Sequence, residues 1–223
     1  MATKMSCSWS AENATKAYIR TMNMARAEGA NQLNGAEFVS ALAAGNNARY
    51  TVVACSGHAD SITLALATAS HQTGGRVVCI LPEAGLLEAS RLSLGSNVEF
   101  LVGDAQELLS SDYREADFIA IDCNLENHEE IFKSVQGSGR QCNTVVLGYN
   151  AFGKRSWRSS SLRISLLPIG EGLLMTRIAS ANKKSGVVGM EKRGRFVVKV
   201  DKCTGEEHFF RVRSTQPRPV IQA

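Results

Sequence analysis

The most constraining feature of the sequence is an alternation of short apolar runs with longer amphipathic stretches. Five runs between residues 49 and 150 are apolar almost throughout: RYTVVAC, RVVCIL, VEFLVG, ADFIAID and NTVVLGYN. Each of the first four is followed by a stretch with apolar residues at helical spacing, such as DSITLALATASHQT after the first. A strand that is apolar on both faces must be covered on both faces, so the pattern predicts a mostly parallel sheet between two layers of helices.

The segments on either side of this region complete the predicted fold. SAENATKAYIRTMNMARAE, with Ser10 as a candidate N-cap, and GAEFVSALAAGN are expected to be helices. RISLLPIGEGLLMTRIA predicts an antiparallel hairpin at the edge of the sheet, and GRFVVKVDKCTGEEHFFRVR predicts a second hairpin. The expected fold class is therefore α/β, with a doubly wound, Rossmann-like sheet, an antiparallel edge hairpin and an extra C-terminal β-hairpin. We expect N-terminal helices of the same domain in residues 1–46, the Rossmann-like core in 47–180, and the hairpin extension with a loose tail in 181–223.

Composition limits the class of protein. The 223 residues are 44% hydrophobic and 21% charged, which is typical of a globular protein with a sizeable core. No apolar run approaches the ~20 residues that span a bilayer, and the first residues lack the apolar centre of a secretory signal. The expected location is the cytoplasm, with the nucleus as an alternative. The six cysteines include no C-x-x-C pair, which favours reduced, buried thiols over a disulfide framework or a zinc site.

Charge is distributed unevenly along the chain. From Lys154 onward there are 15 Lys and Arg against 5 Asp and Glu, whereas residues 1–153 hold 10 against 16. A basic C-terminal third can attract an acidic partner or nucleic acid. No aromatic stacking pattern is interleaved with these charges, so a solvated basic surface is the favoured interpretation.

Polar and small residues follow the ends of the first four predicted strands. In a doubly wound sheet these ends form one edge, where ligands bind near the reversal of strand order. Gly57 allows a ligand to approach the backbone, Glu83 can accept hydrogen bonds from a ribose, and Asp104 can accept one from an adenine amino group. Asp122 can hold a cation or the ammonium group of an amino-acid ligand, although each such acid is also a common helix cap. The predicted ligand-binding residues are Ser56, Gly57, Ser61, Glu83, Asp104, Ala105 and Asp122.

Three segments resemble the class I S-adenosylmethionine-dependent methyltransferases, within them the caffeoyl-CoA and catechol O-methyltransferase type. LLPIGEGLLMTR, from Leu166 to Arg177, is similar to a segment of that family's closing hairpin, and GDAQELL and ADFIAID match it in order and spacing. The terminal segments WSAENATKAYIR and VDKCTGEEHFFRV most closely resemble an uncharacterised plant family of methyltransferase-like proteins. The resemblance implies S-adenosylmethionine as cofactor, a small-molecule acceptor of unknown identity, and a homodimer.

The cofactor-binding positions depart from this family. The acid of the family's first loop falls on Val53, and its outer glycines fall on Cys55 and Ala59. The middle glycine remains, as Gly57. The family's ribose-binding acid falls on Leu81, so Glu83 would have to reach in from two residues later.

The metal-binding positions depart as well. Metal-dependent members of the family hold a cation with two aspartates and an asparagine. Asp122 and Asn150 match two of these positions, but the second aspartate falls on Tyr149, and the family's lysine base falls on Leu125. One carboxylate and one amide make a poor site for a hard divalent cation. We therefore expect no metal, with Asp122 and Asn150 as remnants of the site.

The catalytic group is not identified by the sequence. His58 in the first loop and His128 beyond Asp122 can each act as a general base near neutral pH. Tyr149 can place its hydroxyl at the vacated metal position or pack there. Two functions stay open: a metal-independent methyltransferase, and a catalytically degenerate methyltransferase fold that serves as a binding or scaffold module. A nicotinamide dehydrogenase is disfavoured because ACSGHAD lacks the G-x-G-x-x-G pattern.

Overall fold

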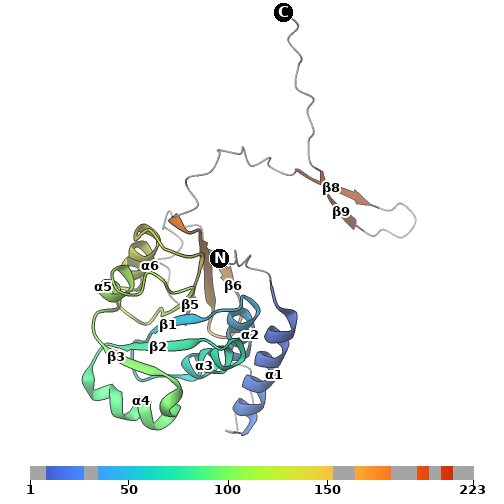
Figure 1. Ribbon diagram of the computed structural model, residues 1–223. Coiled ribbons are helices and arrows are strands. Elements are labelled where there is room, and N and C mark those ends of the chain that lie inside the picture. The colour runs from blue at the N-terminus through green and yellow to red at the C-terminus, as the bar shows by residue number, and fades with distance from the viewer. Residues whose placement is uncertain (1–8, 28–34, 153–163, 182–194, 201–206, 213–223) are drawn as a thin grey trace, which may run out of the picture. The chain divides into compact units, whose positions relative to one another are not determined.

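The chain forms two compact units, Met1–Lys184 and Ser185–Ala223. In the computed structural model of the protein (Figure 1), the described residues are 9–27, 35–152, 164–181, 195–200 and 207–212. The loose tail that the sequence predicts beyond the second hairpin lies outside these residues. Among the helices of the described ranges, none combines the length and apolarity needed to cross a membrane.

The first unit is built on a seven-stranded sheet with the order β3-β2-β1-β4-β5-β7-β6. β1 to β5 are mutually parallel where they pair, whereas β7 is antiparallel to both of its neighbours. The strands are β1 Tyr50–Ala54, β2 Arg76–Leu81, β3 Glu99–Val102, β4 Phe118–Asp122, β5 Thr144–Tyr149, β6 Ser165–Leu167 and β7 Leu173–Ile178. Every predicted strand is confirmed to within two residues at each end.

The edge hairpin is also confirmed, with one detail that the sequence did not specify. β7, the second strand of the hairpin, pairs with β5, so that the three-residue strand β6 becomes the edge of the sheet. A short edge strand limits the unpaired backbone that the sheet presents to other chains.

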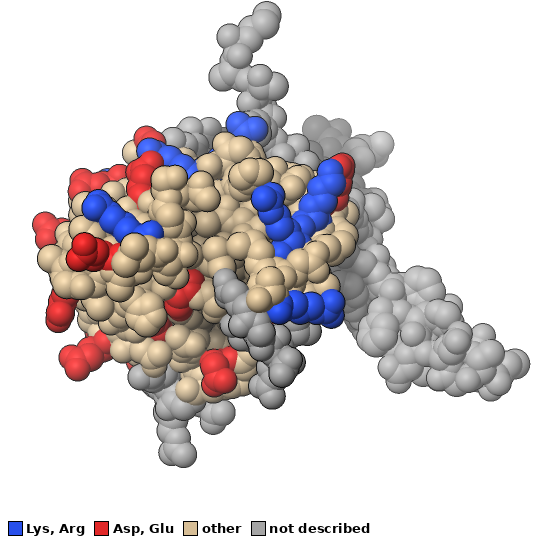
Figure 2. Space-filling model, turned by 90° about the horizontal axis from the view of Figure 1, so that it is seen from below, with Lys and Arg blue, Asp and Glu red and all other residues tan. Residues whose placement is uncertain are grey.

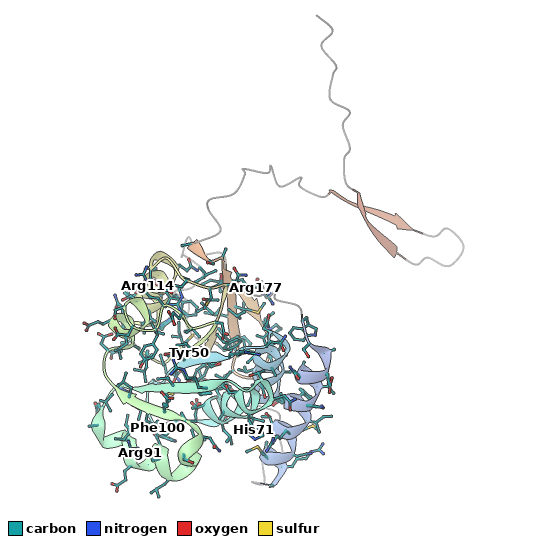
Figure 3. All side chains as sticks on the ribbon, viewed as in Figure 1. Tyr50, His71, Arg91, Phe100, Arg114 and Arg177 are labelled. Atoms are coloured by element: carbon teal, nitrogen blue, oxygen red, sulfur yellow. The ribbon has the colours of Figure 1, made fainter. Side chains whose placement is uncertain are left out.

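Helices cover both faces of the sheet (Figures 1 and 3). The helices are α1 Ala11–Ala27, α2 Ala36–Gly45, α3 Ser61–Thr73, α4 Leu87–Leu94, α5 Ala105–Ser110 and α6 His128–Gly137, with short 3-10 helices η1 Ala84–Leu86 and η2 Gly95–Asn97. The first four pack with one core, and α5 and α6 pack with the other. Ser10 caps α1 as predicted, since its Oγ accepts a hydrogen bond from the Asn13 N–H at 3.2 Å.

The two cores explain the continuous apolar runs. Val53 of β1 and Cys79 of β2 belong to the core beneath α1–α4, whereas their neighbours Val52 and Ile80 belong to the core beneath α5 and α6. Successive strand residues point to opposite faces, so both sets must be apolar. The predicted doubly wound α/β fold is therefore confirmed.

The second unit contains the predicted C-terminal hairpin. β8 Arg195–Val200 and β9 Glu207–Val212 pair in antiparallel fashion, with Arg195 opposite Val212 at one end and Val200 opposite Glu207 at the other. They form a sheet of two strands.

Candidate functional site

A cavity of about 310 Å³ opens at the carboxyl ends of β1 to β4. The sheet order reverses here, because β2 lies on one side of β1 and β4 lies on the other. Such a switch point is where open α/β sheets bind ligands. The lining residues are Cys55, Ile80, Pro82, Gly103, Asp104, Ala105, Leu125 and Asn127.

The loop between β1 and α3 presents small residues, as the sequence predicts. Ser56 and Gly57 are half-buried, whereas His58 and Ser61 are exposed. A Cβ atom added to Gly57 would meet no atom within 4 Å. Packing therefore does not require a glycine at this position, and the space above its backbone is open.

Asp60 closes this loop as the N-cap of α3. Its Oδ1 accepts hydrogen bonds from the N–H groups of Ile62 and Thr63, both at 3.1 Å, and from the Thr63 hydroxyl at 3.3 Å. Burial raises the pKa of the Asp60 carboxyl above its ordinary value. In dinucleotide-binding enzymes the corresponding helix N-terminus receives the pyrophosphate. Here a carboxylate already occupies those donors, which argues against a dinucleotide more strongly than the missing glycines do.

Two substitutions of Asp60 separate its hydrogen bonds from its charge. Asp60→Ala is expected to lower the free energy of unfolding by about 1 kcal/mol, because it removes a helix cap. Asp60→Asn keeps an accepting oxygen and removes the buried charge, so it should be at least as stable as the wild type near neutral pH. A carboxyl with a raised pKa binds its proton more tightly in the folded state, so ionisation costs stability above that pKa, and the cost disappears at lower pH.

Urea denaturation at several pH values checks this prediction. The advantage of Asp60→Asn over the wild type should be present near neutral pH and should shrink as the pH falls through the raised pKa of Asp60. An advantage that grows toward acid would contradict the assigned direction of the pKa.

Asp104 and Ala105, at the start of α5, both line the cavity. The exposed Asp104 caps the helix, since its Oδ1 accepts hydrogen bonds from the N–H groups of Gln106 at 2.7 Å and Glu107 at 3.3 Å. Both bonds use one carboxylate oxygen. The side chain therefore serves as a helix cap and also lines the cavity, so the two interpretations of the sequence are compatible.

The end of β2 contributes no carboxylate to the cavity lining. Leu81 is fully buried in the core. Glu83 is exposed and lies between Pro82 and η1. Of Leu81, Pro82 and Glu83, only Pro82 lines the cavity. The expected substitution of Glu83 for the family's ribose-binding acid has no geometric support among the described side chains.

Asp122, the last residue of β4, lies beside the cavity and is 5% exposed. Its Oδ2 accepts hydrogen bonds from the N–H and the hydroxyl of Ser56, at 3.3 and 2.5 Å. Its Oδ1 accepts from the Asn124 N–H at 3.0 Å and from the Asn150 Nδ2 at 2.9 Å. The carboxylate thus connects the loops that follow β1, β4 and β5.

Tyr149 packs in the core rather than at an open ligand position. It is 2% exposed and lies in the core that contains Val53 and Leu147. Its hydroxyl donates to the Cys55 sulfur at 3.8 Å, and burial raises its pKa well above the ordinary value. A phenol that stays protonated near neutral pH is a poor general base.

The two histidine candidates lie in different environments. His58 is exposed, whereas His128 is 8% exposed at the start of α6. The Nδ1 of His128 lies 2.8 Å from the Leu125 carbonyl oxygen, which can only accept, so Nδ1 carries the proton. The Nε2 of His128 is buried without a hydrogen-bond partner in the described part of the chain. Neither histidine nor Tyr149 is among the described residues that line the cavity.

The remnant metal positions do not fit a divalent cation. Both oxygens of Asp122 already accept hydrogen bonds from the chain, and Asn150 turns its NH₂ group, not its carbonyl oxygen, toward the carboxylate. That amide orientation follows from the partner, because an ionised carboxylate only accepts. Within the described ranges, no group of three or more His, Cys, Asp and Glu side chains is arranged to hold a metal ion.

The structure adds residues that sequence analysis did not select. Leu125 and Asn127 line the cavity, and they lie in the same DCNLEN segment from which only Asp122 was chosen as a binding residue. Asp60 directly precedes an amphipathic stretch, which is a sequence signal for an N-cap. Of the predicted binding residues that the structure describes, Asp104 and Ala105 are in the lining.

A family model described as "Protein of unknown function (DUF1442)" matches residues 5–212. The chain belongs to this family. No curated protein matches the sequence. The relation to a plant family stays a prediction.

Solved structures share the fold of about three quarters of this chain. A methyltransferase from Geobacter sulfurreducens has a TM-score of 0.54 and 22% identity, over 74% of this chain and 89% of that chain. A Podospora anserina methyltransferase bound to S-adenosylhomocysteine has a TM-score of 0.54 and 14% identity, over 76% and 88%. An O-methyltransferase from Bacillus cereus in complex with S-adenosylhomocysteine has a TM-score of 0.50 and 19% identity, over 73% and 90%. At these identities the likeness shows a Rossmann-like methyltransferase fold.

Proposed function

We propose that this DUF1442 protein is an S-adenosylmethionine-dependent methyltransferase that uses no metal ion, with an acceptor still to be identified. The observation that carries the proposal is the cavity at the carboxyl ends of β1–β4, in which Asp104 is the one charged side chain of the described lining. The fold supports it, since two of the similar methyltransferases were solved with S-adenosylhomocysteine.

The chemistry of the cavity favours a nucleoside without phosphate groups. Its volume of about 310 Å³ is at the lower end of the roughly 300–1,000 Å³ of ligand pockets. Ile80, Pro82 and Leu125 offer apolar surface for a purine ring. Asp104 can accept a hydrogen bond from its amino group, whereas a phosphate would meet this carboxylate without any lysine or arginine of the described lining to offset the charge.

The residues of the chain would act by binding and orientation. A bound donor would supply a methyl group on a positively charged sulfur: the acceptor nucleophile would bond to the methyl carbon as the carbon–sulfur bond breaks, and S-adenosylhomocysteine would leave. Ile80 and Leu125 would limit the access of water to the purine. Asp104 would orient the purine through its amino group. Holding donor and acceptor in line supplies a large part of the rate of such a reaction. Asp104, the one carboxylate of the described lining, is assigned to the purine, and no histidine lines that part of the cavity, so we expect an acceptor that is nucleophilic without losing a proton.

A second candidate function is a catalytically degenerate fold that binds a partner. The buried Leu81 favours it, because the cavity lacks a described carboxylate at the end of β2. The basic C-terminal third, a homodimer contact, or both would then provide the working surface. Figure 2 shows basic side chains of the described residues scattered among uncharged surface on the face in view, with acidic side chains gathered along one side.

Isothermal titration with S-adenosylmethionine and S-adenosylhomocysteine tests the proposed function. We expect micromolar binding that is unchanged by EDTA or magnesium. Asp104→Asn keeps an oxygen to cap α5 but loses an acceptor for the purine amino group, so its affinity should fall about tenfold. Asp112→Ala, which removes an exposed acid just beyond α5, is the matched control and should bind as the wild type does.

The outcomes separate the two candidate functions. No heat and no thermal shift with either ligand at millimolar concentration would exclude the methyltransferase and favour the binding module. Binding that Asp104→Asn leaves unchanged would place the ligand elsewhere than in this cavity.

A further inference from the structure

Three loops at the edge of the sheet converge on one buried carboxylate. Asp122 receives two hydrogen bonds from Ser56 in the loop after β1 and one from Asn124 in the loop after β4. It receives a fourth from Asn150 in the loop after β5. A carboxylate offers about four acceptor directions, so the hydrogen-bonding capacity of this side chain is used within the chain.

Ser56 is held at two atoms, and this fixes the path of the first loop. Its N–H and its hydroxyl bond to the same oxygen of Asp122, at 3.3 and 2.5 Å. The preceding residue, Cys55, lines the cavity and donates its N–H to the Ile80 carbonyl oxygen at 3.1 Å. The following residue, Gly57, has open space above its backbone. Ser56 therefore anchors the loop between Cys55, which lines the cavity, and Gly57, whose backbone is open to a ligand.

The backbone conformation of Asn150 also indicates that its side chain is needed for the hydrogen bond to Asp122. Its φ of 57° lies in the left-handed region, which costs a non-glycine residue free energy and is tolerated best by asparagine and aspartate. A glycine would relieve that cost but would lose the amide that bonds to Asp122 at 2.9 Å. The asparagine is explained by the hydrogen bond that it makes.

We propose that Asp122, Ser56 and Asn150 form a hydrogen-bonded latch that holds the Ser56–Gly57 backbone in the conformation that receives the methyl donor, in place of a cation site. In this arrangement Ser56 and Asn150 are positioning residues: they act on the donor through the loop. The inference rests on the proposed function for the identity of the ligand. The latch itself rests on the four hydrogen bonds.

Affinity for S-adenosylhomocysteine in paired variants tests the latch. Ser56→Ala removes the hydroxyl and is expected to weaken binding about tenfold, whereas Ser56→Thr keeps a hydroxyl and should stay within about threefold of the wild type. Asn150→Gly suits the backbone but removes the amide, and should weaken binding by a similar factor. Asn124→Ala is the matched control, because Asn124 contributes only its backbone N–H, and it should bind as the wild type does.

Coupling between the variants separates positioning from general destabilisation. If the latch acts as one unit, the double variant Ser56→Ala/Asn150→Gly should lose little more affinity than the weaker-binding single variant. A general loss of stability would instead add the two effects and would not be rescued by Ser56→Thr. Manganese should leave the affinity of the wild type unchanged.

Each contrary result has a distinct meaning. If the wild type binds S-adenosylhomocysteine and both single variants bind equally well, the latch is overturned and the proposed function stands. If manganese tightens binding and Asp122→Asn abolishes that effect, the carboxylate takes a cation and the latch is again overturned. If the wild type binds no donor, the proposed function fails, and amide hydrogen exchange of residues 56–59 decides the latch: faster exchange in Ser56→Ala supports it, and unchanged exchange overturns it.

Discussion

Tyr149→Asp is expected to lower the free energy of unfolding by at least about 4 kcal/mol, out of the roughly 5–15 kcal/mol that stabilises a typical domain. The substitution introduces the aspartate that the resemblance to metal-dependent O-methyltransferases implies for this position. In this fold, however, the side chain is 2% exposed within a core that includes Val53 and Leu147. The aspartate would leave a cavity the size of an aromatic ring and would bury a carboxylate beside apolar groups.

Tyr149→Phe is the control for this prediction. It keeps the ring and removes only the hydroxyl that donates to the Cys55 sulfur at 3.8 Å, a weak contact, so the loss should stay below about 1 kcal/mol. Urea denaturation of the three proteins gives the comparison. A stable Tyr149→Asp protein that binds manganese would show that this position can present a carboxylate to a cation, and that packing does not decide its role.

The sheet could be predicted from the sequence because its physical signal is local. After the exposed Arg76, the strand RVVCIL alternates between two cores, so each of its remaining residues must be apolar, and the stretch that follows must be helical to cover the sheet. The predicted strands agree with β1–β5 to within two residues. The insertion of β7 between β5 and β6 was not specified, because the sequence of a hairpin does not say which of its strands pairs with the sheet.

The site was less predictable, because its chemistry depends on which loops meet. The position of Asp104 follows from local sequence alone, because it caps α5 directly after the parallel strand β3. Such a residue lies at the carboxyl edge of the sheet, where the cavity opens. Asp122 is different: its partners Ser56 and Asn150 are 66 and 28 residues away in sequence. Glu83 shows that position along the chain is not sufficient: it lies two residues beyond the end of β2, as Asp104 does beyond β3, but only Asp104 is in the described lining.

The opposite edge of the sheet contains a buried charge that sequence analysis did not select. Arg140 is fully buried, just before β5. It donates to the carbonyl oxygens of Leu109 at 3.0 Å, Tyr113 at 2.6 Å and Ala116 at 3.1 Å. Burial lowers the pKa of its guanidinium group, and neither ion pair found among the described residues includes it. Its Nε also donates to the Thr144 hydroxyl at 3.4 Å, so Arg140 connects α5 and the segment after it to the start of β5 by hydrogen bonds to neutral oxygens.

Arg140→Met is expected to lower the free energy of unfolding by about 3 kcal/mol, because several buried carbonyl oxygens lose their donor at once. For a domain of this size the loss corresponds to a fall of about 6–12 °C in the melting temperature. Arg114, labelled in Figure 3, is the matched control: it is only half-buried and donates to the Ser138 and Gly139 carbonyl oxygens. Arg114→Met should cost about half as much or less. If the two variants lose the same free energy of unfolding, the cause is the removal of a long side chain. The loss of a donor to the buried carbonyl oxygens of Leu109, Tyr113 and Ala116 would then not explain the effect.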